Sequence, residues 1–179
     1  MLTGLCLVSE AADFAARRHT GQQRKGRGNE PYVNHLAEVA NLLAMATDGT
    51  DAELVAAGWL HDTVEDTATT REELTQEFGE RVAALVVEVT DDMTLAKAAR
   101  RQKQIVDAPR KSPGAKLIKI ADKISNIRAR IVPEPNQAER DDLMDYVAWA
   151  EKVVAGCRGV NAALDRMFDE TVKQARSTL

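Results

Sequence analysis

The sequence predicts an all-α protein that folds as a single domain over residues 1–179. Only 4% of the residues are aromatic while 44% are hydrophobic, a composition that favours packed helices over a β-sandwich or barrel. Apolar residues recur at intervals of three and four along almost the whole chain, which is the helical period. The segments between these stretches are short, so no linker to a second domain is expected.

The first helix is expected to extend as far as His19, where the glycine-containing segment 21–28 interrupts the helical pattern. Pro31 is then expected to open the second helix, because proline is favoured at the first helical position. This start places His35 one turn inside the second helix.

Asp51 is a predicted N-cap of the third helix, which carries His61 and Asp62 near its C-terminal end. Residues four positions apart share a helix face, so Glu65 would lie beside His61 if the helix persists that far. Asp66 would lie beside Asp62 in the same way. Metal ligands and acid–base carboxylates would then be one turn apart.

The run Thr70-Arg71-Glu72-Glu73 fits the capping-box pattern and predicts the start of another helix. Gly79 is expected to separate this helix from the next one. The run 85–89 could form a buried strand on composition, but the residues before it favour a helix. Further helices, separated by prolines, are expected over about 94–107, 115–130, 137–156 and 160–177.

Charge and cysteine content restrict the class of protein. The formal net charge of −4 argues against general binding to nucleic acid or to an anionic membrane. No segment approaches the roughly 20 apolar residues of a membrane span. Cys6 and Cys157 show no paired spacing, so reduced thiols and a cytoplasmic location are expected.

Basic residues are concentrated in two places, within the segment 17–27 and within the segment 97–103. An acidic chain with two local basic clusters suits a small polyanionic ligand better than a long polymer. The alternative for the second cluster is an ordinary solvated helix face.

A divalent metal site is suggested by His35, the pair His61-Asp62 and Asp122. Each of these features is weak evidence for a metal site by itself, since isolated histidines and single His-Asp dipeptides are common. Asp122 differs because it lies in a strongly apolar helical segment, where a carboxylate needs a cation or hydrogen-bond donors. A salt bridge to a lysine is the structural alternative. Two imidazoles and two carboxylates together suit a divalent ion that activates water.

Several motifs in this order resemble one family. The segments 19–25, 30–35 and 61–66, followed by 122–126, are similar to the hydrolase domain of RelA/SpoT homologues, within the HD superfamily of metal-dependent phosphohydrolases. The resemblance covers nearly the whole chain, so the synthetase and regulatory domains of the long homologues are not expected here. It implies a small alarmone hydrolase with the all-helical HD-type fold.

The resemblance also implies a reaction and a site, namely Mn²⁺-dependent removal of the 3′-pyrophosphate from the guanosine nucleotide (p)ppGpp to give GDP or GTP. The implied metal ligands are His35, His61, Asp62 and Asp122. The implied catalytic carboxylates are Glu65 and Asp66. The implied substrate contacts are Arg24, Lys25, Asn126, Tyr146, Lys97 and Arg101. His19 is expected to be structural, because the ligand set is complete without it.

Alternatives remain open at this stage. The chain could act as a phosphatase on another nucleotide such as NADPH, or bind a nucleotide without turnover. Tyr146 could be a core or interface aromatic instead of a ligand contact. The acidic segment 139–142 departs from the positive charge that a small alarmone hydrolase would offer near the distal phosphates. The oligomeric state is not predicted.

Overall fold

The computed structural model describes residues 3–24 and 30–178, and these residues form an all-α structure, as the sequence predicts. Within these two ranges the only extended pairing is a single β-bridge between Gln23 and Pro31. The helices, in chain order, are α1 (Gly4–Arg18), α2 (Val33–Ala46), α3 (Ala52–Leu60), α4 (Thr63–Asp66), α5 (Arg71–Phe78), α6 (Glu80–Val89), α7 (Lys97–Asp107), the 3₁₀ helix η1 (Ala108–Arg110), α8 (Pro113–Arg128), α9 (Gln137–Ala155) and α10 (Ala162–Ser177).

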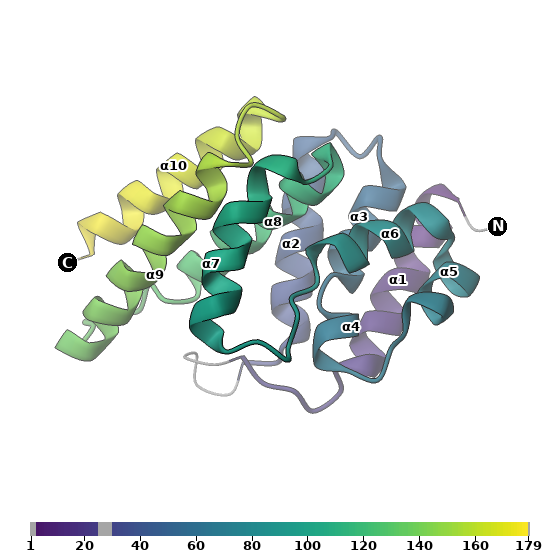
Figure 1. Ribbon diagram of the computed structural model, residues 1–179, viewed down its shortest axis with the longest axis horizontal. Coiled ribbons are helices and arrows are strands. Elements are labelled where there is room, and N and C mark those ends of the chain that lie inside the picture. Colours follow the sequence, from purple (N-terminus) through teal and green to yellow (C-terminus); the bar gives the residue numbers. More distant parts are fainter. Residues whose placement is uncertain (1–2, 25–29, 179) are drawn as a thin grey trace.

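Helix α8 lies at the centre of the molecule, between α1 to α6 on one side and α9 and α10 on the other (Figure 1). It packs against α2, α3, α6, α9 and α10. Ile118, Ile120 and Ile124 of α8 are fully buried, and several of its polar side chains are also buried. Polar groups on this helix therefore need partners inside the protein.

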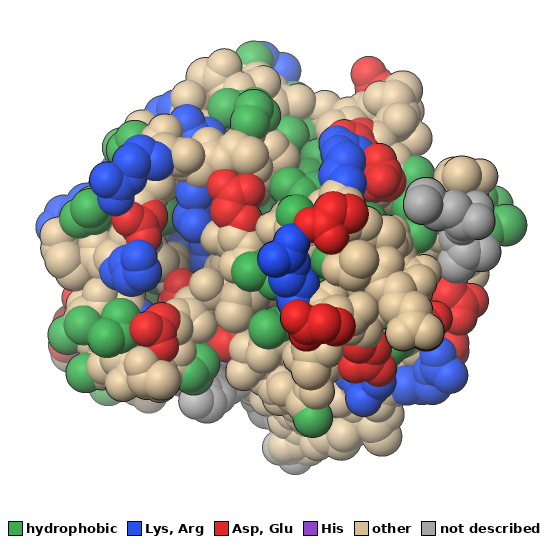
Figure 2. Space-filling model, turned by 45° about the vertical axis from the view of Figure 1, so that its right-hand side comes forward, with side chains coloured by type: hydrophobic (Ala, Val, Ile, Leu, Met, Phe, Trp, Pro, Cys, Tyr) green, Lys and Arg blue, Asp and Glu red, His purple; other side chains and the backbone are tan. Residues whose placement is uncertain are grey.

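The histidines also lie in the interior. His19, His35 and His61 are each less than 5% exposed. On the face drawn in Figure 2, acidic and basic side chains lie close together and no histidine is visible. No helix among the described residues is long and apolar enough to cross a membrane.

The second helix begins two residues later than expected, at Val33 instead of Pro31. Pro31 has no backbone N–H and takes part in the β-bridge with Gln23. The N–H of Tyr32 donates to the carbonyl of Gln22 at 2.9 Å, which extends this pairing. The extended segment delays the helix, but His35 remains within its first turn.

The third helix does not persist through His61 and Asp62, because α3 ends at Leu60 and the short helix α4 begins at Thr63. At this junction, two side chains donate hydrogen bonds to main-chain carbonyls. His61 Nδ1 donates to the Gly58 carbonyl at 2.8 Å, and Thr63 Oγ1 donates to the Leu60 carbonyl at 2.6 Å. Local side-chain bonds of this kind compete with helix continuation. His61 and Asp62 therefore occupy a turn.

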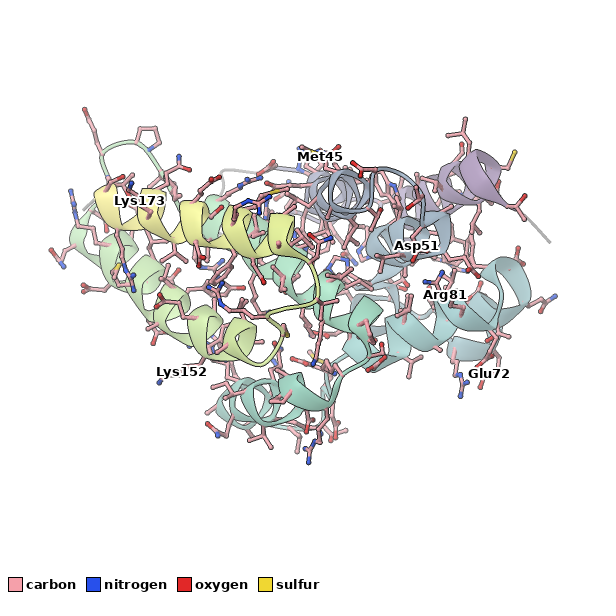
Figure 3. All side chains as sticks on the ribbon, turned by 90° about the horizontal axis from the view of Figure 1, so that it is seen from above. Met45, Asp51, Glu72, Arg81, Lys152 and Lys173 are labelled. Atoms are coloured by element: carbon pink, nitrogen blue, oxygen red, sulfur yellow. The ribbon has the colours of Figure 1, made fainter. Side chains whose placement is uncertain are left out.

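Of the two predicted helix N-caps, the one at Asp51 forms as expected, whereas the capping box at Thr70 forms only in part. Asp51 accepts a hydrogen bond from the Leu54 N–H at 3.1 Å, as expected, and Arg81 binds both of its oxygens (Figure 3). Thr70 accepts from the Glu73 N–H at 3.2 Å, but Glu73 pairs with Arg18. A reciprocal capping box forms instead at Asn136–Glu139, where the sequence analysis did not predict it.

The remaining helices agree with the expectations apart from small shifts at their ends. The run 85–89 belongs to helix α6, so the strand alternative is wrong. Gly79 separates α5 from α6 with a φ of 89°, a conformation that favours glycine. Pro113 is in the first turn of α8, after the N-cap Ser112.

Replacing Gly58 with Ala should destabilise the protein, because α2 and α3 approach closely there. An added Cβ would lie 2.6 Å from Leu43 Cδ1 and 3.3 Å from Ala40 Cα. We expect a loss of about 1–3 kcal/mol in the free energy of unfolding, measured with urea. The control is Ala148→Gly, which makes the reverse exchange at an exposed position inside α9. It therefore measures the contribution of helix propensity without a change in packing. A more stable Gly58→Ala protein would contradict the close approach.

Candidate active site

Four side chains from three parts of the chain meet beside α8. His35 comes from α2, His61 and Asp62 from the turn between α3 and α4, and Asp122 from α8. Ligand atoms of the first three lie within 4.8 Å of one another. Asp122 Oδ1 lies 3.4 Å from His35 Nε2 and 3.9 Å from His61 Nε2. The structure thus brings together all four predicted metal-site residues.

The orientation of His61 suits a metal ligand. Its Nδ1 lies 2.8 Å from the carbonyl of Gly58, which can only accept, so Nδ1 carries the proton. Nε2 is then left with a lone pair directed towards the cluster. This atom is buried and has no hydrogen-bond partner, although Asp62 Oδ2 is 3.0 Å away. A buried lone pair without a donor fits a cation.

His35 presents Nε2 to both carboxylates, at 3.4 Å from Asp62 Oδ2 and 3.4 Å from Asp122 Oδ1. Burial opposes a charged imidazole, but hydrogen bonds to Asp122 and Asp62 outweigh it and raise the pKa of His35 to about 9. Burial works against both carboxylates, yet nearby cationic groups hold their pKa values below the usual range. The cluster therefore favours positive charge at its centre and fits a divalent ion.

Each carboxylate is held in place by further side chains. The hydroxyl of Tyr32 donates to Asp62 Oδ2 at 2.6 Å. Lys123 Nζ donates to Asp122 Oδ2 at 2.7 Å, and Asn126 Nδ2 donates to Asp122 Oδ1 at 2.5 Å. The lysine salt bridge considered as an alternative for Asp122 is thus present together with the cluster. Asn126, predicted to contact the nucleotide, orients this carboxylate.

Glu65 and Asp66 lie in the short helix α4, next to the cluster. Burial raises the pKa of Glu65 to about 7, although the backbone N–H of Asp91 donates to its Oε2 at 3.0 Å. Burial and the neighbouring charge of Asp62 also raise the pKa of Asp66. A carboxylate with a pKa near 7 can gain and release a proton at neutral pH.

One pocket contains the cluster carboxylates, both α4 carboxylates and an array of cations. Lys97, Arg101, Asn126 and Tyr146, four of the predicted substrate contacts, line this pocket. Cations that the sequence analysis did not assign to the site also line it, namely Arg100, Lys119, Lys123 and Arg130. Lys119, Lys123, Asn126 and Arg130 recur at intervals of three and four. This helical spacing places them on one face, so the three cations could have been predicted from the sequence to lie near Asn126.

The two aromatic side chains of α9 in this pocket contact cations with their faces. The guanidinium of Arg130 lies 3.9 Å from the ring centre of Tyr146. Arg101 and Lys123 lie 4.9 Å and 4.5 Å from the ring centre of Trp149. Such cation–π contacts hold the charged groups in place. Tyr146 is therefore both a buried aromatic and part of the pocket wall.

Arg24 lies at the edge of this region, in an adjoining hollow that shares Asn126 and Arg130 with the main pocket. Its guanidinium is buried and donates to both the carbonyl and the hydroxyl of Ser125, each at 2.9 Å. Lys25, the other half of the predicted Arg-Lys pair, lies outside the described residues.

His19 is buried outside the four-residue cluster. Its Nδ1 lies 2.7 Å from Gln22 Oε1, and its ring stacks on Tyr32 with 5.2 Å between ring centres. Tyr32 in turn donates to Asp62, so His19 supports the cluster indirectly. This position agrees with the structural role expected for it.

An all-helical domain in which two buried histidines and two aspartates meet has the architecture of the HD class of proteins. A family model described as the HD domain matches residues 11–146. The chain therefore belongs to the HD-domain family and, through its full-length relatives, to the group that contains the SpoT-like hydrolases.

Among these relatives is the human guanosine-3′,5′-bis(diphosphate) 3′-pyrophosphohydrolase MESH1, which is 45% identical over 172 residues, with 95% of each chain covered. The MESH1 protein of Drosophila melanogaster is 41% identical, with 92% of each chain covered. A solved structure of a metazoan orthologue of SpoT, described as hydrolysing ppGpp, superposes with a TM-score of 0.87 at 39% identity and covers 100% of both chains.

Glu65→Gln should stabilise the metal-free protein at high pH. Because burial raises the pKa of Glu65 from 4.5 to about 7, the folded protein retains a proton that the unfolded chain loses. Stability from this group is present below about pH 4.5 and is lost as the pH rises to about 7. In urea unfolding, the free energy of unfolding of the variant should therefore rise relative to that of the wild type as the pH increases from about 4.5 to about 8.

The control for this measurement is Glu72→Gln, at an exposed residue of α5 (Figure 3). Because its side chain is exposed, this substitution measures the effect of removing a solvated charge over the same pH range. A Glu65→Gln difference with the same pH dependence as the control would show that Glu65 does not retain its proton.

Proposed function

We propose that this chain is a Mn²⁺-dependent 3′-pyrophosphohydrolase acting on the guanosine nucleotide (p)ppGpp. The observation that carries the proposal is a single pocket lined both by Asp62 and Asp122, the two carboxylates of the four-residue cluster, and by a group of cations on α7 and α8. A substrate with a diphosphate at each end of a nucleoside can bind the cluster with one diphosphate and the cations with the other. The names of the full-length relatives support this substrate.

A divalent ion held by His35, His61, Asp62 and Asp122 would polarise a phosphoryl oxygen and make water a stronger acid. Both histidines direct Nε2 inward, and the hydroxyl of Tyr32 fixes Asp62. Oxygen and imidazole ligands of this kind are compatible with Mn²⁺.

Glu65 is the carboxylate we assign to accept the proton from the attacking water. Its pKa of about 7 lies close to neutral pH, which is the condition for an efficient general base. The N–H of Asp91 fixes one of its oxygens and leaves the other free to face the pocket. Asp66, in the next position, also lines the pocket, where its carboxyl group can orient the water or the phosphate.

Lys119 and Lys123 are suited to neutralise charge that develops on the phosphate oxygens. Both are buried side chains that line the pocket, where the attraction between charges is stronger than in bulk water. Lys119 donates to the Val89 carbonyl at 2.7 Å and Lys123 to Asp122, so both ammonium groups are held in place before substrate binds. Arg101, fixed against Trp149, extends this positive surface towards the second diphosphate.

A direct test is to incubate the purified protein with ppGpp and, separately, with NADPH, each in Mn²⁺ and in chelator. Pyrophosphate and GDP should form only with metal. Asp62→Ala should abolish turnover because it removes a ligand from the cluster. Orthophosphate from NADPH with ppGpp untouched would favour the phosphatase alternative, and tight ppGpp binding without turnover would favour a silent domain.

Asp142→Asn should lower the KM for ppGpp. Asp142 lines the pocket and binds Arg130 at 3.1 Å, so it opposes an anionic ligand and occupies one of the cations. Because the pair is exposed, we expect only about a two- to fivefold effect on KM, with kcat little changed. Asp141→Asn is the matched control, since the neighbouring Asp141 bonds to Gln137 outside the pocket. Equal KM values for the two variants would contradict this role of Asp142.

A further inference from the structure

On the side of His35 away from the cluster, the second ring nitrogen, Nδ1, is hydrogen-bonded to a serine of α8. His35 Nδ1 lies 2.9 Å from Ser125 Oγ, on the side of the ring opposite the carboxylates. Both side chains are buried, with His35 2% exposed and Ser125 0% exposed. The hydrogen bond therefore forms without competition from bulk water.

A serine hydroxyl can donate or accept, so its other partners decide the direction of this bond. Ser125 Oγ lies 2.6 Å from Glu38 Oε2, and a carboxylate that also binds Arg128 at 3.1 Å can only accept. The single hydroxyl proton of Ser125 is thus committed to Glu38. The oxygen must then accept from His35, which places a proton on Nδ1 and leaves Nε2, facing the cluster, as the ring nitrogen that can give up its proton to bind a metal.

Arg24 strengthens this arrangement. Its guanidinium donates to Ser125 Oγ at 2.9 Å, which fills the second lone pair of the hydroxyl. It also donates to the Ser125 carbonyl at 2.9 Å. The same nitrogen lies farther from His35 Nδ1, at 3.3 Å, and cannot donate to a ring nitrogen that already carries a proton.

We propose that the Ser125–Glu38 pair acts as a positioning relay that fixes the tautomer and orientation of His35 for metal binding. The inference rests on the metal site of the proposed function and extends it to two residues that touch neither metal nor substrate. His61 needs no such pair, because the Gly58 main-chain carbonyl fixes its tautomer. The relay supplies the equivalent constraint for His35 through side chains.

The chain contains a matched pair for a control. Ser112 Oγ donates to Glu88 Oε2 at 2.6 Å, the same distance as between Ser125 and Glu38, and Ser112 also belongs to α8 as its N-cap. Neither Ser112 nor Glu88 lines the pocket or contacts a cluster residue. Removing this second pair should reduce helix stability without changing the metal site.

The test is a Mn²⁺ titration of each full-length variant, with free Mn²⁺ followed by electron paramagnetic resonance and no nucleotide present. Ser125→Ala and Glu38→Ala should weaken Mn²⁺ binding by about 10- to 100-fold, the usual effect of removing a partner of a metal-bound histidine. Ser125→Thr keeps the hydroxyl and should restore the affinity to within about threefold of the wild type. Ser112→Ala and Glu88→Ala should bind as the wild type does.

Three results would overturn the relay: wild-type affinity in Ser125→Ala, failure of Ser125→Thr to restore binding, or an equal loss in the Ser112 and Glu88 controls. Thermal unfolding with and without Mn²⁺ gives a second readout, since a weaker site loses metal-dependent stabilisation. A wild-type protein that binds Mn²⁺ but leaves ppGpp intact would refute the proposed function and not the relay. A wild-type protein that binds no Mn²⁺ would refute both.

Discussion

The burial of Asp122 and the partial burial of Asp62, beside two buried histidines, is the constraint on which the surrounding structure depends. Asp62 and Asp122 are both drawn towards the interior, where an ionised carboxylate is costly unless cations and donors surround it. Tyr32, Lys123 and Asn126 supply such partners, and each belongs to an element that packs around the pocket. The same polar interactions that make this burial tolerable also hold together a cluster that could bind a divalent ion.

Helix α8 combines structural and chemical roles because of how its residues are distributed. Its isoleucines fill the core between five other helices, while Asp122, Lys123 and Asn126 face the pocket. Ser125 lies on the same helix and reaches His35 from behind. A change in the packing of α8 would therefore alter the four-residue cluster, the cations and the support of His35 together.

The sequence predicted the helical class, the order of the helices and the four cluster residues, since these follow from periodicity and from ordered motifs. It did not predict the turn at His61–Asp62, because this depends on side-chain bonds to carbonyls that compete with the helix. The delayed start of α2 has a similar cause, the pairing of Gln23 with Pro31. The relay through Ser125 and Glu38 joins residues 87 positions apart, and no local pattern indicates such a contact.

The wide spacing of the cluster residues along the chain also bears on how the site assembles during synthesis. His35 and Asp122 belong to α2 and α8, and the bond between Arg24 and Ser125 spans 101 positions. Contacts between distant positions form slowly, because a long loop must close before they can contribute. A nascent chain that ends before α8 has only the N-terminal helices, with Asp62 lacking its partner carboxylate. The four-residue cluster is thus complete only after α8, which begins about two-thirds of the way along the polypeptide, has left the ribosome.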